Sequence, residues 1–255
     1  MGGVTSVGDE STAGASRFAG TLFDLLDRVE YRRARLDEPF DPVYRLRYEA
    51  YRREDFIPAN SERIAGDAFD QAPNVMCYGV YIDGQLVSSI RLHHVTPKER
   101  TSPSRSIYQD VLDPLLDEGK SYIDPSRFTA DREATLAYPA LPFLTLRIAS
   151  MASVHFGVDH CLSSVRPEHV AFYKRVFMSR QIGGIRYYPG LHFPVVCYAA
   201  DVPVIRDRVH RRYPFLMATD EEHRALFDSP NGVTQPFVRP SAREASLALE
   251  VDAVA

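Results

Sequence analysis

Charged side chains gather in three short stretches of the sequence that could form one polar site. Asp67 and Asp70 precede a region of predicted strands, Arg91 lies on one of these strands, and Arg127 lies on the next. Because neighbouring strands bring their side chains together, we expect the four residues to form one ion-pair network. The network could simply organise a loop, or an arginine in it could bind a substrate carboxylate through two hydrogen bonds. The sequence leaves both interpretations open.

Patterns typical of several other kinds of site are missing from the sequence. It has no Gly-x-Ser-x-Gly elbow, no P-loop and no dinucleotide-binding glycine fingerprint, and no His has metal-ligand spacing with a second His or Cys. We therefore expect no metal site. Cys77, Cys161 and Cys197 are widely spaced in apolar surroundings, which predicts buried free thiols and a reducing setting.

The composition is that of an ordinary globular protein, with 255 residues of which 45% are hydrophobic and 25% charged. The formal net charge of −4 argues against non-specific nucleic-acid binding, because neutralising phosphates requires a basic excess. No apolar run reaches the roughly 18 residues that cross a bilayer, and residues 1–14 lack the layout of a signal peptide. We therefore expect a cytoplasmic protein without a membrane span.

Both ends of the chain differ in composition from its middle. Residues 1–17 are small and polar, and residues 229–255 mix Pro, Ser and scattered charges without a lasting period. Such segments are typically disordered or flexible, which leaves residues 18–228 as one working domain.

Hydrophobic periodicity and turn residues divide this domain into strands and helices. The clearest signal is Asp83-Gly84, a two-residue turn between two β-rich segments, and Pro125 within a later strand indicates a bulge or an edge. Strands are expected at 29–34, 76–82, 86–95, 121–129, 161–165, 184–188 and 193–199, and helices at 42–53, 106–116, 141–155 and 168–177. The order predicts a mixed α/β (α+β) fold centred on a sheet.

Over residues 29 to 200 this order resembles the GNAT acyltransferase fold, in which helices flank a central mixed, mostly antiparallel sheet in three layers. Five motifs, in shared order, resemble those of acyl-homoserine-lactone (autoinducer) synthases. They are Arg47 with Tyr51, Asp67-Ala68-Phe69-Asp70, Ser89-Ile90-Arg91-Leu92, Asp124-Pro125-Ser126-Arg127-Phe128, and the apolar helix that follows. The resemblance implies an acyltransferase.

Two departures from that family point to a sister group. Ile57 and Ala65 stand where the autoinducer synthases usually have a Trp and a Glu that shape the S-adenosylmethionine pocket, and the chain contains no Trp at all. The motifs look nearer to those of the N-acyl amino acid synthases, which join a carrier-bound acyl chain to a free amino acid. Acyl-homoserine-lactone synthesis and a noncatalytic GNAT-fold acyl-binding or interaction protein remain as alternatives.

The resemblance assigns catalytic roles to three residues. Asp124 occupies the acidic place of the family motif and would act as general base through a water, provided that burial raises its pKa. A carboxylate paired with Arg127 or Arg91 is the structural alternative. Ser126 could hydrogen-bond the donor carbonyl or a pantetheine amide, and Tyr173 lies in a segment that resembles the late GNAT helix whose tyrosine protonates the leaving sulfur.

Further residues would bind the substrate amine. Arg47 would anchor the loop that carries Asp67, and Tyr51 and Phe128 would wall the pocket unless they are core residues. His169, at the start of the helix that carries Tyr173, would contact substrate or cap that helix.

The identity of the acyl donor is inferred from the absence of a glycine-rich pyrophosphate-binding loop. Most GNAT enzymes hold the coenzyme A pyrophosphate on a glycine-rich loop, but here the chain reads Thr129-Ala130-Asp131-Arg132-Glu133, whose carboxylates would repel it. We therefore expect no bound cofactor and, as donor, the acyl-phosphopantetheine thioester of an acyl carrier protein, with an amino acid or other small amine as acceptor. Lys174, Arg175 and Arg180 are the expected carrier-docking surface, and the run from Arg206 to Arg212 is its rival.

Overall fold

A seven-stranded sheet forms the middle of the protein in this computed structural model, which describes residues 18–252 except 36, 39–40, 190–192 and 229–236. The strand order is β1-β2-β3-β4-β5-β7-β6, and every neighbouring pair is antiparallel except β4 with β5. The strands are β1 (Val29–Arg33), β2 (Val75–Ile82), β3 (Gln85–Val95), β4 (Tyr122–Ala130), β5 (His160–Val165), β6 (Arg180–Tyr187) and β7 (Pro194–Asp201).

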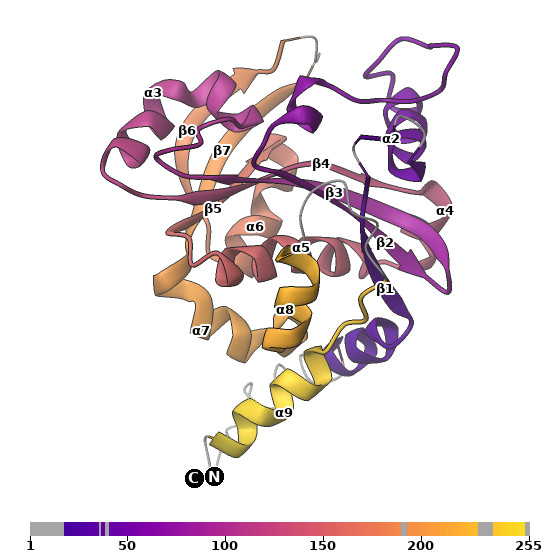
Figure 1. Ribbon diagram of the computed structural model, residues 1–255, viewed down its shortest axis with the longest axis vertical. Coiled ribbons are helices and arrows are strands. Elements are labelled where there is room, and N and C mark those ends of the chain that lie inside the picture. Colours follow the sequence, from indigo (N-terminus) through magenta and orange to yellow (C-terminus); the bar gives the residue numbers. More distant parts are fainter. Residues whose placement is uncertain (1–17, 36, 39–40, 190–192, 229–236, 253–255) are drawn as a thin grey trace, which may run out of the picture.

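Helices cover both faces of the sheet, so the molecule has three layers (Figure 1). One face carries α2 (Pro42–Arg53) and α3 (Pro103–Asp117); the other carries α5 (Leu141–His155), α6 (Val170–Phe177), α7 (Val202–Arg212) and α8 (Asp220–Phe227). The short α4 (Arg132–Ala137) links β4 to α5, and α9 (Ala242–Asp252) lies farther from the sheet. The predicted mixed α/β fold of GNAT type is confirmed.

Local sequence signals explain the best-predicted elements. Asp83 and Gly84 both have positive φ angles, 51° and 78°, as a type I′ turn requires between β2 and β3. At the start of α2, Asp41 accepts a hydrogen bond from the Val43 amide at 3.0 Å, and Pro42 follows the cap directly. The predicted hairpin and the predicted first helix are therefore both confirmed.

The core is divided by the sheet. The larger cluster packs β2, β3 and β4 against α5, with Ile90, Ile123 and Ile148 all fully buried. A second cluster packs α3 against β7, and Tyr108 holds it together because its hydroxyl proton is shared between the carbonyls of Gly184 and Val195, 2.7 and 2.9 Å away. Each fully buried aliphatic side chain stabilises the fold by about 1.5–3 kcal/mol.

The parallel pair β4–β5 is unusually short. Only Tyr122 with His160 and Ile123 with Cys161 pair in register, although β4 continues to Ala130. From Asp124 onwards β4 therefore has no β5 partner, and Pro125, which has no N–H to donate, lies at this free edge as its sequence predicted. The two strands separate beside Asp124.

The C-terminal region differs from the flexible tail expected for residues 229–255. Residues 229–236, like residues 1–17, lie outside the described part, but Val238 pairs with Tyr31 through two 2.8 Å backbone bonds. Glu222, paired with the buried Arg147, accepts two bonds of 2.7 Å from Ser241 and so ties the start of α9 to the domain. No described helix is both long and apolar enough to cross a bilayer.

Candidate active site

Asp124 is fully buried, and Ser104 bonds both of its carboxylate oxygens. Its two carboxylate oxygens accept the backbone N–H of Ser104 at 2.8 Å and the Ser104 hydroxyl at 2.6 Å. Ser104 lies in the first turn of α3, directly after Pro103. Neither Arg91 nor Arg127 is bonded to this carboxylate, so the structural ion pair left open by the sequence does not form.

The surroundings of Asp124 make it a stronger base than an ordinary aspartate. Burial raises its pKa above the usual value, and the hydrogen bonds from Ser104 and Ser102 oppose this effect without cancelling it. A raised pKa was the condition that the sequence set for general-base catalysis, and here its physical cause is the lack of water around the carboxylate.

A chain of hydroxyl groups continues from this carboxylate. The Ser104 hydroxyl lies 2.7 Å from the Ser164 hydroxyl on β5 and 3.4 Å from the Tyr188 hydroxyl just after β6. The sequence analysis missed all three residues. The Ser102-Pro103 pair could have revealed Ser104, because Ser before Pro is typical of a helix start, whereas the predicted helix began only at residue 106.

The predicted ion-pair network is present beside this site. Asp67 accepts hydrogen bonds from Arg91 at 2.5 Å and from Arg127 Nε at 3.1 Å. Asp70 is bonded to Arg47 at 2.8 Å and lies 3.0 Å from Arg91. Burial acts to raise the pKa of both aspartates, but the arginines outweigh it and hold each pKa below its usual value.

A bulge in β4 aims Arg127 at this network. Ser126 pairs with Arg91 and Thr129 with Ser89, so two residues of β4 lie opposite a single residue of β3 between these pairs. The extra residue adopts a left-handed conformation at Arg127, with φ of 51°, and this turns the Arg127 side chain towards Asp67. Ser126, expected to bind the donor, accepts a 3.1 Å bond from Arg91 Nε and keeps its own proton to donate.

The structure places three other residues expected near the substrate, Arg47, Tyr51 and Phe128, in different surroundings. Arg47 is completely buried and bonds Asp70 and the Cys77 sulfur, so it anchors the loop as expected. Tyr51 lies under the Arg127 guanidinium, 5.0 Å from ring centre to Cζ. Phe128, one residue after the bulge, packs against the larger core on the opposite face. Phe128 is thus a core residue, the alternative that the sequence left open, and it does not share a pocket with Tyr51.

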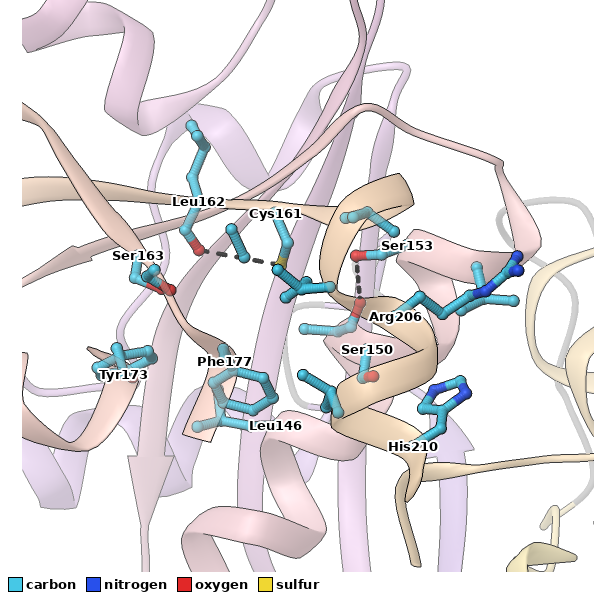
Figure 2. Close-up of a pocket in the computed structure, with 17 residues that line it drawn as sticks. Leu146, Ser150, Ser153, Cys161, Leu162, Ser163, Tyr173, Phe177, Arg206 and His210 are labelled. Atoms are coloured by element: carbon cyan, nitrogen blue, oxygen red, sulfur yellow. Dashed lines mark hydrogen bonds between the residues drawn. The ribbon is translucent and has the colours of Figure 1, made fainter. Parts of the chain in front are cut away.

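A mostly apolar pocket lies on that opposite face, between α5, β5, α6 and α7 (Figure 2). The cavity volume is about 50 Å³. On the same measure a single water needs roughly 10–15 Å³, so the pocket has room for several atoms of a ligand. Cys161, Tyr173 and Phe177 line it, and α7 closes it with Ile205 and Val209.

Tyr173 and Asp124 therefore lie on different faces of the sheet. Ile123 and Cys161 pair in register and share one face, so Asp124, the next residue, points to the other. Burial raises the pKa of Tyr173, and its hydroxyl stays protonated at neutral pH. A substrate that contacts both residues must therefore extend from one face of the sheet to the other.

Four predicted residues lie on the surface around α6. His169 is exposed at the N-cap position, where its side chain caps nothing but lies 3.1 Å from Arg166, so the capping alternative is wrong. Lys174, Arg175 and Arg180 are exposed, as a docking surface must be. Helix α6 contacts α7, and Arg208 reaches the Met178 sulfur at 3.8 Å, so the two rival basic surfaces adjoin.

No group of three or more His, Cys, Asp or Glu among the described residues could hold a metal ion.

Comparison with known proteins identifies the family. Residues 42–201, from α2 through β7, match the family described as N-acyl amino acid synthase FeeM. The chain belongs to this family. As a member it is an acyltransferase enzyme, and the sequence resemblance to N-acyl amino acid synthases is confirmed. No match was found among curated proteins.

Solved structures of FeeM and of acyl-homoserine lactone synthases are similar to this chain at low sequence identity. The structure of FeeM, an N-acyl amino acid synthase from uncultured soil microbes, is 20% identical, with a TM-score of 0.54 over 67% of this chain and 89% of that chain. MesI, a CoA-dependent acyl-homoserine lactone synthase, is 18% identical, with a TM-score of 0.48 over 68% of this chain and 86% of that one. The synthase LasI is 14% identical, with a TM-score of 0.47 over 82% and 98%.

Proposed function

We propose that this acyltransferase moves a fatty acyl group from the thioester of an acyl carrier protein to the amine of an amino acid. The observation that carries the proposal is Asp124, a fully buried carboxyl of raised pKa at the point where β4 leaves β5, in a chain of the FeeM family. The carboxylate supplies the base that amide formation requires.

The chemistry joins the amine nitrogen to the thioester carbon and breaks the carbon–sulfur bond. Asp124 takes the proton that the attacking amine loses, through a water, and Tyr173 gives a proton to the departing sulfur. The products are an amide and a free thiol. A thioester lying where the two strands separate has Asp124 on one side and Tyr173 on the other, which accounts for their places on opposite faces.

The acceptor would meet the exposed end of the ion-pair network. Asp67 and Arg127 keep 27% and 19% of their side-chain surfaces exposed, whereas Arg47, Arg91 and Asp70 keep 2% or less. Only the first two are therefore in reach of an amino acid. Arg127 matches its carboxylate and Asp67 its ammonium group before deprotonation.

Two features after β4 support a carrier protein rather than coenzyme A as donor. The Asp131 carboxylate caps α4 by accepting the Ala134 N–H at 2.9 Å and so lies in the segment that lacks the glycine-rich loop, and the first turn of α5 has no free amide. Leu141 donates its N–H to the Tyr138 carbonyl at 2.9 Å, Pro142 has none, and Phe143 and Leu144 donate to the Ala140 carbonyl. No amide of that turn is left for a pyrophosphate, which helix N-termini otherwise bind. The acyl chain would then enter the apolar pocket below β5.

One reaction series tests the function. Purified enzyme receives acyl carrier protein or coenzyme A thioesters with pooled amino acids, and mass spectrometry identifies the product. An N-acyl amino acid formed from the carrier thioester is the expected result. An acyl-homoserine lactone formed only with S-adenosylmethionine, or no product with any donor, would overturn the proposal.

A second series tests the docking surface formed by Lys174, Arg175 and Arg180. Reversing Lys174 and Arg175 to Glu should lower kcat/KM for the carrier thioester while leaving the small acyl-pantetheine thioester unaffected. The loss should shrink as salt rises past about 0.1 M, where screening reaches about 10 Å. Reversal of Arg211 and Arg212 on α7 is the matched comparison. If the α6 variant keeps the wild-type kcat/KM for the carrier thioester as well as for the pantetheine thioester, the α6 surface is excluded as the docking site.

A further inference from the structure

We propose that Ser104 is the positioning residue for Asp124: from the first turn of α3 it fixes the orientation of the carboxylate and keeps it ready to accept a proton. The inference rests on the proposed acyl transfer and concerns a residue that lies 20 positions from Asp124 in the chain. No substrate contact is required of Ser104.

The geometry places both donor groups of one residue on both oxygens of one carboxylate. The Ser104 N–H lies 2.8 Å from Oδ2 and its hydroxyl 2.6 Å from Oδ1, with 1% of Ser104 and 0% of Asp124 exposed. Two bonds to separate oxygens allow the carboxylate plane no free rotation. The Ser104 N–H that meets Oδ2 belongs to the first turn of α3, before the kink at Tyr108.

The helix that carries Ser104 is itself fixed. The Ser102 hydroxyl caps its N-terminus by accepting the Arg105 N–H at 3.2 Å, and Tyr108 ties its middle to β6 and β7. The position of the Ser104 N–H is thereby set by packing that does not depend on substrate.

The hydrogen bonds from Ser104 also set the charge of the site. Burial disfavours the ionised form of Asp124, and both bonds from Ser104 favour it. Without them only the Ser102 hydroxyl and the charge of Arg91 would oppose burial, and the carboxyl would ionise less readily. Because a hydrogen bond to a charged group changes a pKa by about 1–2 units, the Ser104 hydroxyl has a measurable effect.

The same hydroxyl offers the proton a way out. A serine hydroxyl has a single proton, so Ser104 donates to ionised Asp124 and accepts from Ser164 or Tyr188, 2.7 and 3.4 Å away. Once Asp124 is protonated it becomes the donor, and Ser104 can donate to Ser164, which is half-buried. The chain of bonds reverses direction without any movement of heavy atoms.

Other titratable groups near Asp124 do not change charge at neutral pH. His93 on β3 pairs with Asp124, and burial lowers its pKa to about 4. Burial raises the pKa of Cys161 to about 11 and that of Cys197 to about 12. The remaining neighbours are the permanently charged Arg91 and two tyrosines whose pKa burial raises, Tyr122 and Tyr188. Among these groups, Asp124 is the one whose change of charge falls between these limits, and the comparison of variants with the same substrate separates it from the titration of the acceptor amine.

The test compares Ser104→Ala with Ser106→Ala, a serine of the same helix whose hydroxyl bonds the Pro103 carbonyl at 2.6 Å. In the pH profile of kcat/KM, the rising limb should move up by about 1–2 pH units in Ser104→Ala only. The plateau should fall by about 10- to 100-fold as the carboxylate loses its orientation. Ser104→Thr keeps the hydroxyl and should restore both.

A measurement without turnover separates this inference from the proposed function. Carbon-13 NMR of aspartate-labelled protein gives the pKa of the Asp124 carboxyl directly, assigned by its loss in Asp124→Asn. An upward shift in Ser104→Ala supports the inference even if no acyl transfer is found. Profiles and NMR titrations of Ser104→Ala that coincide with those of Ser106→Ala would overturn it, and Ser104→Gly, which also lacks the hydroxyl, supplies the same test if the alanine variant does not fold.

Discussion

Replacing Asp124 by Asn should abolish most activity and yet leave the protein at least as stable. The amide has the same shape, so its oxygen accepts the Ser104 N–H and its NH₂ donates to the Ser104 hydroxyl, and every buried polar group keeps a partner. Loss of a general base reduces turnover by about 10²–10⁴-fold. A less active but more stable variant is typical of a functional residue that strains its fold.

The stability gain depends on pH in a definite direction. Because the folded pKa of Asp124 lies above its unfolded value of about 3.9, the folded wild type binds more protons than the unfolded chain between the two values. Wild-type stability therefore falls as pH rises through this window, and Asp124→Asn avoids the loss. Each unit of the pKa difference is worth about 1.4 kcal/mol, or about 3–6 °C in melting temperature for a chain of this size.

Thermal unfolding of both proteins from about pH 4 to about pH 8, together with steady-state kinetics, provides the assay. Asp117→Asn, at an exposed carboxylate paired with Arg100, is the matched control and should change neither activity nor the pH dependence. Near-normal turnover in Asp124→Asn would remove Asp124 from the mechanism. A stability difference that does not vary with pH would refute the claim that its carboxyl is perturbed by burial.

Three further substitutions probe other parts of the molecule. Arg127→Lys loses the fork that bonds Asp67, so we expect a melting temperature lower by about 2–5 °C and about tenfold lower kcat/KM, and wild-type values would contradict the network's role. Val209→Leu adds a methylene to the pocket wall and should lower kcat/KM for the longest accepted acyl chain by about tenfold in a chain-length series; an unchanged profile excludes this pocket. Glu222→Gln breaks the buried pair with Arg147 and should cost about 3–5 kcal/mol by denaturant unfolding without lowering kcat, and a smaller loss would show that Arg147 finds another partner.

The sequence alone determined the order of elements and much of the polar network. The turn Asp83-Gly84, the cap Asp41 and the apolar periodicities act between residues close in the chain, so their structures could be predicted locally. The members of the Asp67, Asp70, Arg91 and Arg127 network were also predicted, because opposite charges on adjacent strands and their flanking loop have few other partners.

Only the tertiary structure decided which groups surround Asp124. Its partner Ser104 lies on a helix that begins three residues earlier than the sequence predicted, and Tyr188 lies beyond β6. The contact between them therefore depends on how α3 packs on β6 and β7. The early end of the β4–β5 pairing likewise follows from strand register, which no local pattern specifies. A pairing one residue longer or shorter would change which side chain lies at that separation.

The two faces of the sheet were likewise assigned only by the fold. The bulge at Arg127 returns its side chain to the face of Asp67 and sends Phe128 to the other, whereas plain alternation would have reversed both. Helix α7, which lies beyond the family match, closes the apolar pocket. Local propensity specifies that a strand or helix forms, but the convergence of side chains from distant elements depends on register, bulges and packing angles, and these are set by the whole core at once.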